Sequence, residues 1–143
     1  MSTEENKAIA RRWVELWNSQ NVAAVDEFVA SNYVRHDPNT PEVRGAVAEK
    51  QLIAMVLAAF PDIHFTIEDL VAAGDTVAGR YTLRGTHNGE WLGIPPTHKA
   101  ITLTVMEIYR IADGKIAEQW VILDALGMLQ QLGVISPTGQ AAR

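Results

Sequence analysis

The apolar residues in the first part of the chain recur with the period of a helix. Ile9, Trp13 and Trp17 lie on one face of a predicted helix over residues 3–18, whose start has the spacing of a capping box. Two further helices are predicted: a short one between the cap Asn21 and the pair Ser31-Asn32, and a longer one over residues 46–59 with Val47, Leu52, Met55, Val56 and Ala59 facing inward. The residue before Pro38 is pushed out of the helical region, so residues 33–38 are predicted to be extended.

From His64 onward the period changes to two, the period of a strand. Alternation predicts strands from His64 to a turn at residues 73–75, and then over residues 76–86, 100–111 and 115–123. Asp113 and Gly114 readily take the positive φ angles of a tight hairpin turn, so the last three strands are predicted to form an antiparallel meander. A final helix over residues 125–132 is predicted to end at Gly133, and residues 134–143 are expected to be a flexible tail.

The order of these elements indicates the fold class. Helices that come first and strands that come second predict an α+β fold, with three N-terminal helices packed on one face of a curved, mainly antiparallel sheet. The strand pattern is interrupted by the stretch THNGEWLGIPPT at residues 86–97, whose glycines and prolines indicate a long, stiffened loop. Trp91 in this loop is more easily explained as a lid or a dimer contact than as core.

Composition excludes several classes of protein. A chain of 143 residues, 48% hydrophobic and 20% charged, is typical of one globular domain. The net charge of -5 gives nucleic acid no basic surface to bind. The absence of cysteine rules out disulfides and thiolate metal sites, and the N-terminal MSTEENKAIARR has neither a signal-peptide pattern nor a membrane span. We therefore expect a cytoplasmic protein that does not bind membranes.

Three stretches carry a family resemblance: FPDIHFTIEDLVAAGD from Phe60, RGTHNGEWLGIPPT from Arg84 and IADGKIAEQWVILDALGMLQQLG from Ile111. With them, the sequence from Ala8 to Gly133 resembles the SnoaL-like polyketide cyclases of the NTF2-like superfamily. That resemblance implies an NTF2-like cone with a hydrophobic pocket between helices and sheet, often a homodimer. The activity it implies is intramolecular aldol ring closure in aromatic polyketide biosynthesis.

The resemblance also assigns individual positions. The acid/base aspartate of the founding cyclase aligns with Val121, and a neighbouring histidine aligns with Glu107. The aromatic residue at the end of the first helix is kept in kind as Trp17, and the polar residue at the pocket mouth corresponds to Arg35 or His36. Because valine cannot transfer a proton, the pocket is expected to be kept while its chemistry has changed.

Strand alternation indicates which residues share the concave face of the sheet. If Glu107 faces the cavity, Leu103, Val105 and Tyr109 accompany it from its own strand, and Gln119 and Val121 from the next. On the preceding strand the inward set is either Arg80, Thr82 and Arg84, or Val77, Gly79, Tyr81 and Leu83. The resemblance favours Arg80. A buried Arg80 would lower the pKa of Glu107, whereas burial without a cation would raise that pKa toward a useful general acid or base; a structural ion pair or an exposed Glu107 is the alternative.

Other candidates have equally plain structural alternatives. Asp124 stands where it could cap the last helix, and His36 and His87 lie at loop boundaries where they could shuttle a proton or simply hold a turn. No HxH or HExxH pattern occurs, so we expect no metal site and no cofactor. The candidate catalytic residues are Glu107, His87, His36 and Asp124, and the candidate substrate-binding residues are Trp17, Tyr33, Arg80, Trp91, Gln119, Trp120 and Val121.

Two functional hypotheses follow. The first is a cofactor-free cyclase or isomerase that acts on a small apolar carbonyl compound by proton transfer. The second is a non-catalytic ligand-binding or dimeric accessory protein of the same fold, since fold alone does not confer chemistry. A third, epoxide opening, is weak because Arg80 and Arg84 have no adjacent acid. A homodimer is expected because the convex face of the sheet would otherwise leave apolar residues in water.

Overall fold

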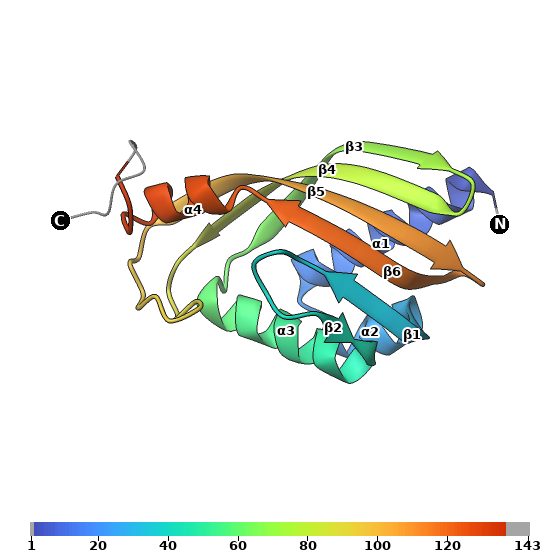
Figure 1. Cartoon of the computed structure of the whole chain (residues 1–143), viewed down its shortest axis with the longest axis horizontal. Coiled ribbons are helices and arrows are strands. Elements are labelled where there is room, and N and C mark those ends of the chain that lie inside the picture. The colour runs from blue at the N-terminus through green and yellow to red at the C-terminus, as the bar shows by residue number, and fades with distance from the viewer. Residues whose placement is uncertain (1, 137–143) are drawn as a thin grey trace.

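Residues 2–136 are described by the structure, a computed structural model, and they form a bent sheet with helices against its inner face (Figure 1). In chain order the elements are α1 (Thr3–Ser19), η1 (Val22–Ala24), α2 (Val25–Phe28), β1 (Val29–His36), β2 (Val43–Arg44), α3 (Gly45–Ala59), β3 (His64–Ala73), β4 (Thr76–Thr86), β5 (Ala100–Ala112), β6 (Lys115–Leu123) and α4 (Ala125–Gln131). The six strands lie in the order β2-β1-β6-β5-β4-β3, and neighbours are antiparallel except for β1 and β6, which are parallel.

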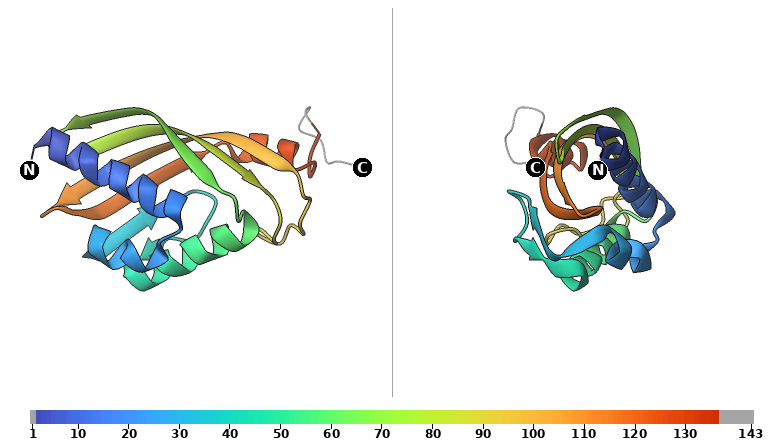
Figure 2. Two further views of the ribbon diagram at one scale, coloured as in Figure 1. Left: turned by 180° about the vertical axis from the view of Figure 1, so that it is seen from behind. Right: turned by 90° about the vertical axis from the view of Figure 1, so that its right-hand side faces the viewer.

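The layers match the predicted fold class. Helix α1 packs against β3 and β4, and α3 packs against β1. In the end-on view of Figure 2 the sheet bends around the space between these two helices, and Figure 1 shows α4 at the end of the molecule away from the N-terminus. The prediction of an α+β fold, with three N-terminal helices on a curved and mainly antiparallel sheet, is confirmed.

Local signals placed several boundaries correctly. Ser2 and Glu5 form the predicted capping box, with the backbone N–H of Glu5 donating to Ser2 Oγ at 3.0 Å. The turn between β5 and β6 has the positive φ angles expected of it, 51° at Asp113 and 76° at Gly114. Both features depend on neighbouring residues alone, which is why the sequence shows them.

The second predicted helix is mostly wrong. A 3-10 turn and one turn of α-helix end at Phe28, and β1 begins at Val29 rather than after Asn32. Val29 pairs with Ile116 of β6, so a contact with a distant strand overrides the helical pattern of this segment.

The inward face of α3 also differs from the prediction. Val47 is 70% exposed and Met55 is 44% exposed, while Glu49 and Ile53 are fully buried beside Leu52. Apolar residues occur on several sides of this helix, so their spacing does not define which side meets the sheet.

The loop after β4 closes the end of α3. The backbone N–H groups of Asn88 and Gly89 donate to the carbonyl oxygen of Ala59, at 2.9 and 3.1 Å. A side chain at Gly89 would place its Cβ 2.2 Å from the carbonyl oxygen of Ala58, so only glycine fits here.

The predicted flexible tail lies largely outside the described residues, which end at residue 136. Its first part continues from α4, because the backbone N–H of Val134 donates to the carbonyl oxygen of Leu129 at 3.0 Å. Among the described helices, none combines the length and the apolar character that crossing a membrane requires.

Candidate functional site

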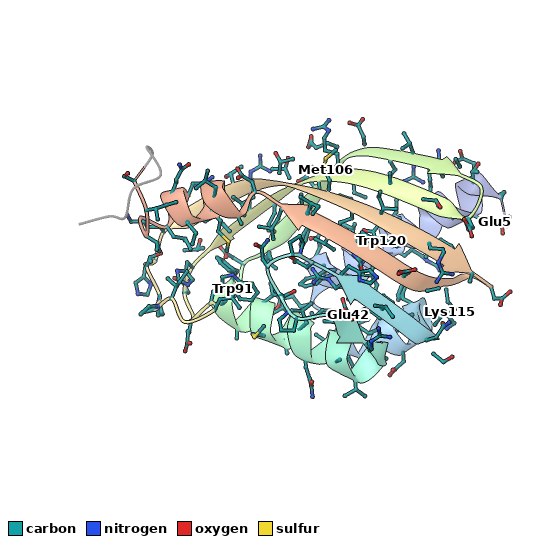
Figure 3. The ribbon with its side chains drawn as sticks, in the orientation of Figure 1. Glu5, Glu42, Trp91, Met106, Lys115 and Trp120 are labelled. Carbon is teal, nitrogen blue, oxygen red and sulfur yellow. The ribbon has the colours of Figure 1, made fainter. Side chains whose placement is uncertain are left out.

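An apolar cavity lies between the helices and the concave face of the sheet. Trp17 of α1 and Leu52 of α3 contribute to one side, and Leu103, Val105 and Val121 of β5 and β6 to the other. Its volume is about 70 Å³, and an adjoining hollow of about 180 Å³ shares Asp37, Thr40, Trp91, Leu123 and Met128 with it. Figure 3 shows Trp91 on the loop beside the end of α3. Together the two spaces approach the lower limit of small-molecule pockets, roughly 300 Å³.

The alternation of β5 and β6 turns both chemistry-bearing and apolar residues toward this cavity. Ile101, Leu103 and Val105 are buried, and Glu107 continues the same face. Glu107 and Val121 are paired across the two strands, so both point the same way. The structure thus places Glu107, Gln119 and Val121 on one face, as the sequence predicts. Glu107 and Val121 line the cavity, whereas Gln119 and Tyr33, predicted to bind substrate, are buried behind it. Glu107 keeps some accessible surface because it faces a hollow.

A chain of hydroxyl groups stabilises the carboxylate of Glu107. The Tyr109 hydroxyl donates to Glu107 Oε2, and the hydroxyls of Tyr81 and Tyr109 are 2.9 Å apart. The Tyr33 hydroxyl donates to Gln119 Oε1 at 2.8 Å. Burial raises the pKa of Glu107, and the Tyr109 hydroxyl, the Arg35 guanidinium and the Gln119 amide oppose that rise.

Arg35 and Asp37 complete the polar end of the cavity. Arg35 Nη1 lies 3.6 Å from Asp37 Oδ2, and their side chains are only 11% and 3% exposed. Both residues line the cavity. Sequence reasoning named Arg35 only as one of two choices and missed Asp37. The period of two along Tyr33, Arg35 and Asp37 was the signal that places all three on the inward face.

Glu49 on α3 is a second buried carboxylate, which sequence reasoning missed. The residue is 0% exposed, and neither of its carboxylate oxygens has a hydrogen-bond partner. Burial raises the pKa of Glu49 to about 7, although Arg35 and the Tyr33 hydroxyl lower it. Its spacing from Leu52 and Ile53 could have shown that it shares their face.

The prediction that Arg80 faces the cavity is wrong. Its guanidinium points to the outer side of the sheet, where Nη2 lies 2.6 Å from Asp69 Oδ2 and the side chain is 46% exposed. The inward set on β4 is the other one, with Val77, Tyr81 and Leu83 buried. Arg80 pairs with Asp69 across β3 and β4, so it does not meet Glu107.

Trp120 and His36 are also on the outer side of the sheet, contrary to prediction. Trp120 is 39% exposed and stacks on the His36 ring at 5.5 Å between centroids. His36 Nε2 lies 2.7 Å from Glu118 Oε2. Strand alternation explains both positions, because Trp120 lies between the inward residues Gln119 and Val121.

His87 and Asp124 lie near the cavity but do not line it. His87 is fully buried, stacks on Phe60 at 5.4 Å, and its Nδ1 accepts from the Thr97 backbone N–H at 3.2 Å. Asp124 Oδ1 accepts from the Gly127 backbone N–H at 2.9 Å and caps α4. These contacts are the structural alternatives that the sequence left open for both residues.

A curved sheet wrapped around helices, with an apolar cavity that ends at the carboxylates of Asp37 and Glu107, is the arrangement of the NTF2-like fold. The SnoaL-like polyketide cyclase family model matches residues 7–132, so the chain belongs to that family. It is 30% identical to the aklanonic acid methyl ester cyclase DnrD of Streptomyces peucetius over 146 aligned positions, which cover 100% of this chain and 99% of that protein.

Two further relatives agree with this assignment. The nogalonic acid methyl ester cyclase of Streptomyces nogalater is 31% identical, with 84% of this chain and 91% of the relative aligned. The crystal structure of IdmH from Streptomyces antibioticus superposes with a TM-score of 0.77 at 34% identity, covering 90% of this chain and 99% of that one. The family and the fold are therefore shown by sequence and by structure.

Proposed function

We propose that this protein is a cyclase that closes a ring by intramolecular aldol addition in an apolar, ester-bearing polyketide. The observation that carries the proposal is Glu107, a carboxylate of raised pKa at the polar end of an apolar cavity. A carboxylate in such surroundings is a stronger base than it is in water. The names of the two cyclase relatives support the choice of a polyketide methyl ester as substrate.

The position of Glu107 supports its role as the base. The acid/base aspartate of the founding cyclase aligns with Val121, and Glu107 is the residue directly opposite Val121 on the neighbouring strand. Side chains opposite one another on a sheet have Cβ atoms about 5 Å apart. A carboxylate at Glu107 can therefore reach the same part of the cavity.

The proposed reaction needs only proton transfer and the substrate's own carbonyl groups. The Glu107 carboxylate removes a proton from the carbon next to a carbonyl, and the enolate oxygen that forms is stabilised by the Arg35 guanidinium. The enolate carbon then attacks a second carbonyl of the same molecule and forms the new C–C bond. The resulting alkoxide takes the proton back from Glu107, which restores the carboxylate.

Turnover of candidate substrates tests this proposal. We expect ring closure of aklanonic or nogalonic acid methyl ester, and a fall of about 10²- to 10⁴-fold in kcat for Glu107→Gln. Glu15→Gln makes the same chemical change on the exposed side of α1 and serves as the control. If Glu107→Gln keeps full turnover, the base is another group, and Asp37 becomes the next carboxylate to test because it also lines the cavity.

A second outcome of the same experiment favours the non-catalytic alternative. Trp17 and Trp91 line the cavity, so a bound aromatic compound should quench their fluorescence. Quenching by aklanonic or nogalonic acid methyl ester without turnover of either would support a ligand-binding protein.

We also propose that the protein is a cytoplasmic homodimer that associates through the outer face of the sheet. Met106, Ile108, Trp120 and Ile122 are each at least 39% exposed and form two pairs across β5 and β6. An apolar patch of this kind is typical of an association surface. Sedimentation at micromolar concentration should show a dimer that Ile122→Lys dissociates, whereas the control Val47→Lys on α3 does not; a wild-type monomer would end this proposal.

A further inference from the structure

Helix α3 places Glu49 behind the polar end of the cavity, where the reaction proposed above does not use it. Glu49 is fully buried, does not line the cavity, and has no hydrogen-bond partner for either oxygen. An ionised carboxylate without donors in the interior is strongly disfavoured. Glu49 is therefore expected to be protonated, unless its negative charge has a function.

The carboxyl groups in and around Glu49 cannot all be ionised at once without a cost in free energy. The charges of Arg35 on β1 and Glu107 on β5 both act on Glu49, and the Tyr33 hydroxyl on β1 favours its ionised form. Arg35 also lies 3.6 Å from Asp37, so one guanidinium serves three carboxylates. Buried like charges near one another favour a state in which one of them is protonated.

The hydrogen-bond donors show which carboxylate keeps the charge. The Tyr109 hydroxyl donates to Glu107, and the Gln119 amide also favours the ionised form of Glu107. The Tyr33 hydroxyl donates its hydrogen bond to Gln119 Oε1, so the amide NH₂ of Gln119 is free to face Glu107. Glu49 is left without a hydrogen-bond donor. The geometry therefore assigns the charge to Glu107 and the proton to Glu49.

We propose that Glu49 and Glu107 act as a coupled pair that shares one proton at slightly acidic pH, with Glu49 holding it and Tyr33 and Gln119 linking the two. Glu49 is a positioning residue: while neutral, it leaves the Tyr33 hydroxyl directed at Gln119 and so keeps the Gln119 amide group on Glu107. Once Glu49 ionises, it competes for the Tyr33 hydrogen and adds a second buried negative charge. The catalytic use of this pair rests on the function proposed above, whereas the pairing itself does not.

The pairing can be measured without substrate by following the carboxyl carbons of glutamate in ¹³C NMR during a pH titration. We expect one resonance that titrates near pH 7 and disappears in Glu49→Gln. In Glu107→Gln the Glu49 titration should move down, because the like charge is gone. In Tyr33→Phe it should move up, because the hydroxyl that favours ionised Glu49 is gone. The control Glu15→Gln should leave the Glu49 titration unchanged.

Two results would overturn the pairing. One is a Glu49 titration near pH 4.3, the value of an exposed glutamate. The other is a Glu49 titration that Glu107→Gln does not move down. Since Glu107→Gln and Tyr33→Phe both report on native Glu49, the test stands even if Glu49→Gln fails to fold.

The pH profile of kcat/KM tests the use of the pair in catalysis. Beside the inflection from Glu107, the wild-type profile should show a second inflection near pH 7, and Glu49→Gln should lack it. A purely structural role of Glu49 would produce no second inflection. If the NMR titrations are as expected but this inflection is absent, the positioning role is wrong. If Glu107→Gln keeps full turnover while the titrations are as expected, the proposed base fails and the carboxylate pair stands.

Discussion

Replacing Glu49 with glutamine should change how the stability of the protein depends on pH. Glutamine has nearly the same shape and cannot ionise, so Glu49→Gln removes one titration from the buried pair. Burial raises the pKa of Glu49 from its ordinary value of 4.5 to about 7 in the folded protein. In the unfolded chain the same carboxyl is in water and returns to its ordinary pKa.

The direction and size of the effect follow from this difference. Below pH 4.5 Glu49 is protonated in both states, and between pH 4.5 and 7 only the folded protein holds the proton, so wild-type stability falls as the pH rises through this window. At about 1.4 kcal/mol per pKa unit, the loss from pH 4.5 to 8 is about 3 kcal/mol. In a chain of this size, that corresponds to roughly 6–12 °C in melting temperature.

Chemical denaturation of wild type and Glu49→Gln at several pH values between 4.5 and 8 measures this effect. The absolute stability of the variant also depends on how its buried amide is satisfied, so the informative quantity is the wild-type free energy of unfolding minus that of the variant at each pH. Titration of the groups that do not interact with Glu49 largely cancels in this difference. We expect the difference to fall by about 3 kcal/mol across the window. A difference that is constant with pH would refute the raised pKa of Glu49.

Three further predictions follow from the site. A Cβ at Gly79 would lie 2.2 Å from the Tyr81 hydroxyl, so Gly79→Ala should displace the hydroxyl chain that supports Glu107 and lower kcat more than Tyr81→Phe does; equal kcat values would contradict this. Arg80→Ala breaks an exposed ion pair with Asp69 and should cost roughly 0.2–1 kcal/mol in denaturation, with unchanged kcat. Val121→Asp puts a second carboxylate opposite Glu107 and should shift the acid limb of the pH–rate profile upward, since like charges raise each other's pKa; an unmoved limb would show that the two groups do not interact.

The sequence by itself determined the features that depend on neighbouring residues or on a simple period. The capping box at Ser2, the turn at Asp113 and Gly114, and the shared face of Glu107 and Val121 were all readable from it. In the first half of β5 the apolar residues Ile101, Leu103 and Val105 alternate with Thr102 and Thr104, and a strand buried on one side turns its more apolar set inward. The part of the candidate site on β5 and β6 was therefore visible before any tertiary contact was known.

The tertiary structure alone decided the features for which two local arrangements were nearly equal. Strand β4 offers an arginine set and a set with Tyr81, and pairing of Arg80 with Asp69 across β3 shows which set faces water. Helix α3 has apolar residues on several sides, so packing against β1 decides that Glu49 rather than Val47 is buried. Burial among Tyr33, Arg35 and Glu107 then gives Glu49 its raised pKa, because a pKa depends on the groups that the fold brings around a carboxyl and on the water it excludes.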